Sequence, residues 1–221
     1  MIYWVVFGVL MLTSWLISMQ LKSKFKKYSE IPLGLSGRDV ALKMLRDNGI
    51  NDVDVICVDG QLTDHYNPDK RTVNLSRDVY EGRNIAAAAV AAHECGHAVQ
   101  HAKAYAFLKL RSALVPIVSF SSNWLQWLLF AGILMVHSFP QLLYFGIAMF
   151  ALTTLFSIIT LPVEVDASAR AIKWLNTSGL STSETYGKAT DALRWAAYTY
   201  FIAALTSLAA LLYYIMIARE R

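Results

Sequence analysis

Four long apolar runs constrain the fold of this 221-residue chain more than any other feature of its sequence. Hydrophobic residues make up 56% of the chain, and the excess over a soluble protein is concentrated in these runs. A helix rises about 1.5 Å per residue, so roughly 20 apolar residues cross the hydrocarbon of a bilayer. The sequence therefore predicts a mainly α membrane protein. The runs extend from Ile2 to Gln20, from about Ala113 to Val136, from about Leu142 to Leu161 and from roughly Ala196 to Ala218.

Basic residues predict how the first run is oriented. Lys22, Lys24 and Lys27 follow it closely, and basic residues gather on the cytoplasmic side of membrane helices. We therefore expect the N-terminus to lie outside and the residues after Met19 to lie in the cytoplasm. A cleaved signal peptide is disfavoured, because no basic residue precedes the run and no small-residue cleavage site follows it.

The second and third runs are predicted to form a membrane hairpin, because only residues 137–141 separate them. Lys109 and Arg111 precede the first limb, and Arg170 and Lys173 follow the second, so both ends are expected inside. The fourth run ends in a basic tail that would lie outside if this helix crossed. The sequence therefore leaves open whether the last helix spans the bilayer.

These runs predict five segments in a multi-pass protein of the plasma membrane. The segments are an anchor at 1–21, a cytoplasmic part at 22–111, the hairpin at 112–161, a cytoplasmic helix at 162–195 and a membrane helix at 196–221.

Charge and cysteine content exclude other classes. The formal net charge of +4 fits basic residues on the cytoplasmic side of a membrane. Nucleic acid is not expected as a partner, because the sequence has no stripe of basic residues interleaved with stacking aromatics. Only Cys57 and Cys95 are present, without a CxxC pair, which excludes a disulfide framework and favours reduced thiols.

The predicted cytoplasmic part reads as a small α+β domain. Ser36 and Asp39 resemble a capping box that starts a helix ending before Gly49. Three short strand signals follow, as a meander. They lie near Val53 to Cys57, Leu62 to Tyr66 and Arg71 to Leu75. An edge strand near Val73 to Leu75 is the expected place for an extended peptide substrate.

The strongest chemical motif is His93-Glu94-Cys95-Gly96-His97, within a segment expected to be helical from Ile85 to Ala104. Residues four apart share a helix face, so His93 and His97 can bind one Zn²⁺. Glu94 lies beside them and is the expected general base for a water molecule that attacks an amide.

The third ligand is less clear from spacing. His101 lies about 12 Å along the helix from His93, too far to share a metal. His65 is in a turn region and His137 is predicted outside. Glu164 and Asp166 remain, at the start of a helix expected to begin at Pro162 and to run from Val163 to Leu175. Acidic residues also favour helix N-termini without binding metal, so spacing alone decides neither.

Four stretches carry a family resemblance, and they are Asp64-His65-Tyr66-Asn67-Pro68, Val73-Asn74-Leu75-Ser76, Ala92-His93-Glu94-Cys95-Gly96-His97-Ala98 and Leu161-Pro162-Val163-Glu164-Val165-Asp166-Ala167-Ser168. In combination they resemble the YugP-like neutral zinc metallopeptidases of bacterial membranes, over nearly the whole chain. A more distant likeness is to the HtpX-like and CAAX prenyl endopeptidases, which can place membrane helices between an HExxH helix and an ExxxD motif.

The resemblance implies a zincin-like domain of the gluzincin type, with one catalytic zinc held by His93, His97 and Glu164. It favours Glu164 over Asp166 as the third ligand. The aspartate expected four residues later is Ser168 here, so Asp166 is the residue that could take its place. It also implies an endopeptidase that acts on membrane or membrane-proximal proteins at the cytoplasmic face.

Two competing hypotheses remain. An intramembrane protease of the site-2 type would need the motif inside a membrane helix and an aspartate ligand in an LDG-like context, and no LDG occurs. A non-catalytic metal-binding scaffold would need four protein ligands and no adjacent general base, which Glu94 disfavours.

Overall fold

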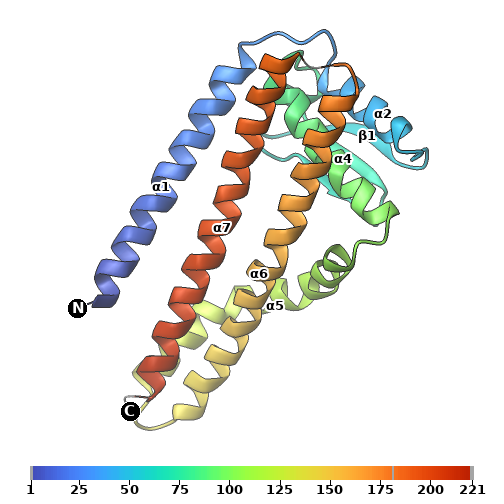
Figure 1. Cartoon of the computed structure of the whole chain (residues 1–221). Helices are drawn as coiled ribbons and strands as arrows, with labels where there is room; N and C mark the ends of the chain where they lie inside the picture. The colour runs from blue at the N-terminus through green and yellow to red at the C-terminus, as the bar shows by residue number, and fades with distance from the viewer. Residues whose placement is uncertain (1, 181, 220–221) are drawn as a thin grey trace. The chain divides into compact units, whose positions relative to one another are not determined.

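The computed structural model describes residues 2–180 and 182–219 (Figure 1). The chain divides into two compact units. The helical unit comprises residues up to 15, residues 106–162 and residues from 199 onward. The mixed unit, which holds the sheet, comprises residues 16–105 and 163–198.

Among the described residues, four helices are long and apolar enough to cross a membrane. They are α1 (Ile2–Ser29), α5 (Ala106–Leu134), α6 (Pro140–Thr177) and α7 (Ser183–Arg219). Most of the apolar surface of these helices is exposed, as expected for helices whose solvent is lipid. The helix α7 is continuous through the fourth apolar run.

Within the helical unit, small residues let α5 and α6 approach closely. A methyl group at Gly132 would lie 2.8 Å from the Cα atom of Leu143. The hydroxyls of Thr154 and Ser207 are 2.9 Å apart and link α6 to α7. Small residues and hydroxyl pairs are the usual means of packing helices in lipid.

The helix predicted to begin at Pro162 is instead part of α6, which runs through this proline. A proline removes one backbone N–H donor from the helix ladder, and the many residues of α6 on either side of it keep the helix continuous. The prediction of a new helix start at Pro162 was therefore wrong, and residue 164 lies inside a long helix.

The sheet of the mixed unit is not a meander. Its strands are β1 (Asp54–Val58), β2 (His65–Asn67) and β3 (Thr72–Ser76), in the order β1-β3-β2. Strand β3 pairs in parallel with β1 and antiparallel with β2. The edge strand expected near Val73 to Leu75 is therefore the central strand. Val73 and Leu75 are fully buried, so their backbone requires partners on both sides.

Three helices surround this sheet: α2 (Gly37–Asp47), α3 (Arg77–Tyr80) and α4 (Ile85–Ala102). The capping box predicted at Ser36 and Asp39 is present at the start of α2. Helix α4 starts at Asn84, whose side chain accepts from the Ala87 amide, and its residues are buried on almost every side. The alanine run at 86–89 therefore belongs to the buried core, where α4 packs against α2 and neighbouring elements.

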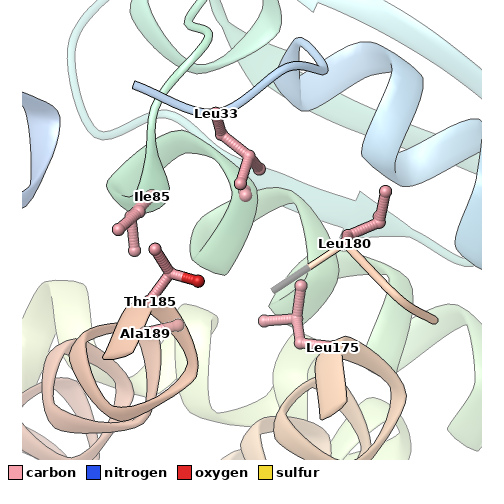
Figure 2. Close-up of a pocket in the computed structure, with 7 residues that line it drawn as sticks. Leu33, Ile85, Leu175, Leu180, Thr185 and Ala189 are labelled. Carbon is pink, nitrogen blue, oxygen red and sulfur yellow. The ribbon is translucent and has the colours of Figure 1, made fainter. Parts of the chain in front are cut away.

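The first turn of α4 also lines a small apolar pocket in the mixed unit. Figure 2 shows Ile85 facing a small pocket with Leu33, Leu175 and Ala189. The hydroxyl of Thr185 is the one polar group among the labelled side chains of this pocket. This pocket is apolar packing and is separate from the polar residues described next.

Candidate metal centre

The motif residues His93 to His97 lie in the second half of α4, directly against the mixed-unit part of α6. Gly96 makes this approach possible, because a methyl group there would lie 2.5 Å from the Ala167 carbonyl oxygen. Ala167 and Ala171 on the facing side of α6 are fully buried. Small residues on both helices therefore bring α6 onto the motif.

This contact brings Glu164 to the two histidines. Its Oε2 atom lies 3.2 Å from His93 Nε2 and 3.5 Å from His97 Nε2. The two imidazole rings lie edge to face, with centroids 4.9 Å apart. Glu164 is only 2% exposed, and a buried carboxylate requires a positive partner.

The donor set fits a zinc ion. His93, His97 and Glu164 form the single group of metal-ligating side chains found within residues 2–180 and 182–219, with donor atoms within 4.8 Å of one another. Zinc bonds to nitrogen and oxygen are about 2.0–2.2 Å long, which places tetrahedral donors about 3.3–3.6 Å apart. The distances of 3.2 and 3.5 Å from Glu164 to the histidines match that separation.

Asp166, the rival third ligand, does not join this group. Its Oδ2 atom accepts hydrogen bonds from the Gln100 amide at 2.8 Å and from Arg170 at 2.6 Å. It lies two residues from Glu164 on the helix and therefore points to a different side. The structure thus separates the two acidic candidates.

Each histidine has a polar partner on its second ring nitrogen. Ser168 Oγ lies 3.1 Å from His93 Nδ1, and Gln100 Oε1 lies 3.0 Å from His97 Nδ1. Ser168 therefore contacts a candidate ligand at the position where the resemblance led us to expect an aspartate. The role of Gln100 was missed from the sequence, although its spacing of three from His97 on one helix face was a usable signal.

Glu94 and Cys95 point to different surroundings. Glu94 is 8% exposed and its charge acts on the nearby His97. The Cys95 thiol lies 3.6 Å from the Ala41 carbonyl oxygen on α2, and burial raises its pKa. Both cysteines are free.

The other three histidines lie outside the cluster. His101 Nδ1 is 2.7 Å from the Tyr66 hydroxyl, which links the end of α4 to β2. His65 lies in β2, and His137 lies in the turn between α5 and α6. Geometry along the helix had already excluded His101 from a shared metal.

The electrostatics of the cluster favour a cation. Burial disfavours the charged form of His97, but the hydrogen bond to Glu164 and the charges of Glu94 and Glu164 outweigh it. These interactions raise the pKa of His97 above its ordinary value of 6.5. A site that attracts a proton to an imidazole also attracts a metal cation.

Other residues of the resembling stretches are structural. The Asp64 carboxylate accepts from the backbone amide and hydroxyl of Ser76, and Asn67 Oδ1 accepts from the amides of residues 69 and 70. The Asn74 side chain donates to the His65 carbonyl across the sheet. These residues shape the strands and the turn between β2 and β3.

The described residues thus combine helices that are apolar and long enough for a bilayer with a cluster of two histidines and a glutamate that could hold a metal ion. Sequence comparison then identifies the family. The chain belongs to the family described as "Putative neutral zinc metallopeptidase", which matches it over residues 3–219.

A curated relative is also similar to this chain over most of its length. "Putative membrane protease YugP" of Bacillus subtilis (strain 168) is 42% identical over 200 residues, which cover 90% of this chain and 88% of the relative. No solved structure gives a significant match.

Proposed function

We propose that this protein is a membrane-bound, zinc-dependent endopeptidase that cleaves membrane or membrane-proximal proteins at the cytoplasmic face. The observation that carries the proposal is the gathering of His93, His97 and Glu164 around one point, with Glu94 beside them. Membership of a zinc metallopeptidase family and the relative named as a membrane protease support it.

The residues divide the chemistry among them. His93, His97 and Glu164 would hold one zinc ion, and three protein ligands are the number that catalytic zinc sites use. When bound, zinc supplies Lewis acidity toward a carbonyl oxygen and makes water more acidic. Glu94 accepts the proton of the attacking water and delivers it to the leaving amine.

A peptide substrate would add to the sheet at the free edge of β2. This strand replaces the buried β3 in that role, because β3 already has partners on both sides. Tyr66 of β2 contacts His101 of α4, so this edge strand packs against the helix that carries the motif. Main-chain pairing suits a protease that accepts many sequences.

The two competing functions have less support. A site-2 type protease would carry its motif inside a membrane helix. Among the described residues, α4 is not one of the helices that are apolar and long enough to cross a membrane. A closed structural zinc site would require four protein ligands, whereas the cluster among the described residues has three.

The proposal is tested with Glu94→Gln in the purified full-length protein, measuring bound zinc and cleavage of an unfolded protein together. Glu81→Gln, an exposed glutamate of the same unit, is the matched control. We expect Glu94→Gln to keep its zinc and to lose cleavage by at least about a hundredfold, since it removes general-base catalysis. Cleavage at the wild-type rate in Glu94→Gln would overturn the mechanism.

A further inference from the structure

Gln100 is a fully buried amide, one turn beyond His97 on α4. Its Nε2 atom donates to the Val163 carbonyl oxygen at 2.7 Å and to Asp166 Oδ2 at 2.8 Å. Its Oε1 atom lies 3.0 Å from His97 Nδ1. All of the hydrogen-bonding groups of the side chain are therefore engaged with α6 and with one imidazole.

These contacts determine which way the amide faces. A backbone carbonyl and an ionised carboxylate can only accept hydrogen bonds, so both require the NH₂ group of Gln100. The amide oxygen must then face His97. An amide oxygen can only accept, so His97 Nδ1 must carry a hydrogen.

A hydrogen on Nδ1 leaves Nε2 of the neutral imidazole with its lone pair free. That nitrogen is the one that lies 3.5 Å from Glu164 Oε2, at the candidate metal position. His93 has no such constraint, because the Ser168 hydroxyl beside its Nδ1 can either donate or accept. The neighbouring side chain therefore determines which ring nitrogen carries the hydrogen in His97 but not in His93.

We infer that Gln100 is a positioning residue that holds His97 in the metal-binding tautomer, and that Asp166 and Arg170 hold Gln100. Asp166 accepts one hydrogen bond from the Gln100 amide and two from Arg170. These bonds form a chain, called the relay here, from Arg170 through Asp166 and Gln100 to His97. The inference rests on the proposed function, because it concerns the same zinc ligands.

The relay also explains why an aspartate two residues after Glu164 is useful without binding metal. The Glu164 carboxylate faces the histidines, and the Asp166 carboxylate contacts the Gln100 amide that orients His97. Partners of this kind change metal affinity by about 10- to 100-fold when they are removed.

Two variants separate positioning from packing. Gln100→Met keeps the volume but removes the acceptor for His97. The double variant Gln100→Glu with Asp166→Asn restores an acceptor for His97 Nδ1 and a donor from position 166, but it leaves the Val163 carbonyl oxygen without its donor. Gln61→Met, at an exposed glutamine of the same unit, is the matched control.

The experiment uses the full-length protein in detergent micelles. The tautomer of His97 is read from ¹⁵N-histidine NMR of the chelator-treated protein, and zinc affinity is read by competition with a chromophoric chelator. Circular dichroism checks that each variant is folded. None of these measurements requires proteolysis, so a failure of the relay is distinguishable from a failure of the proposed function.

In the wild type we expect the hydrogen of neutral His97 on Nδ1. Gln100→Met should lose this preference and bind zinc about 10- to 100-fold more weakly, and the double variant should regain at least part of the lost affinity. The control should match the wild type. A wild-type His97 with its hydrogen on Nε2 would overturn the inference even if Gln100→Met failed to fold. Wild-type zinc affinity in folded Gln100→Met would also overturn it.

Discussion

Gly96 of α4 and Ala167 of α6 are in backbone contact, and this contact determines where the third candidate ligand lies. An added methyl group at Gly96 would come within 2.5 Å of the Ala167 carbonyl oxygen. Glu164 precedes Ala167 by about one helical turn, so it lies over His93 and His97 only while the two helices touch. The glycine inside the HExxH motif is therefore part of the geometry of the site.

Gly96→Ala should separate the two helices and weaken zinc binding by at least about tenfold. Overpacking of this kind also costs about 1–3 kcal/mol of stability. The measurements are the zinc dissociation constant and the thermal midpoint. Gly187→Ala is the matched control, because it is a helical glycine with nothing within 4 Å of the added methyl group. It should be neutral or stabilising by up to about 1 kcal/mol. Equal effects of the two substitutions would show that the contact is unimportant.

Glu164→Ala should remove most zinc, with an affinity loss of at least about a hundredfold, because it deletes a candidate ligand. Asp166→Ala should be milder, at about tenfold, because it acts only through Gln100. Isothermal titration of the chelator-treated proteins with zinc compares them directly. The reverse ranking would make Asp166 the ligand.

His101→Ala should leave zinc affinity within about twofold of the wild type, because the contacts it loses are with Tyr66 and not with the cluster. His93→Ala serves as the positive control and should lose zinc. Metal analysis after dialysis distinguishes the two. A loss of zinc in both variants would place His101 closer to the metal than the structure does.

Zinc removal should destabilise the fold, and the effect should grow with pH. Without zinc, the raised pKa of His97 means that its pairing with Glu164 stabilises the fold fully below the unfolded pKa of 6.5. That stabilisation is lost as pH rises through the higher folded pKa. Zinc binding requires the neutral imidazole and strengthens over the same range.

The thermal midpoints with and without a chelator should therefore diverge as pH rises from about 6 to about 8. Free zinc at about 1,000 times its dissociation constant stabilises the loaded protein by about 4 kcal/mol. In His97→Ala, this pH-dependent difference should disappear. A constant difference in the wild type would contradict the linkage between His97 and the metal.

Local sequence patterns predicted the apolar helices and the helix that carries the motif, apart from the course of α6 at Pro162. The apolar runs, the capping box at Ser36 and the spacing of His93 and His97 all depend on residues within a few positions of one another. The sheet order was not predictable in the same way, because strand pairing depends on which strand the core buries. Residues Val73 and Leu75 were correctly seen as strand residues, but their central place comes from contacts with α2 and α4.

The remaining parts of the site depend on contacts distant in sequence. Spacing left Glu164 and Asp166 as alternatives, and the family resemblance favoured Glu164. The structure shows what each one contacts. Gln100 was not predicted to belong to the site, because two of its three partners, Val163 and Asp166, lie on another helix and far away in the sequence. Pro162 misled the prediction of α6, since a long helix can accommodate one missing donor.

In the proposed function, two histidines and one glutamate hold a single catalytic zinc. Zinc K-edge X-ray absorption of the purified full-length protein tests it most directly. We predict about one zinc per chain with only nitrogen and oxygen neighbours, at about 2.0–2.2 Å, and the multiple-scattering signal of two imidazoles. Cys95 should contribute nothing, because its thiol faces Ala41 on α2. A sulfur neighbour at about 2.3 Å, or a spectrum unchanged in Glu164→Ala, would contradict the account.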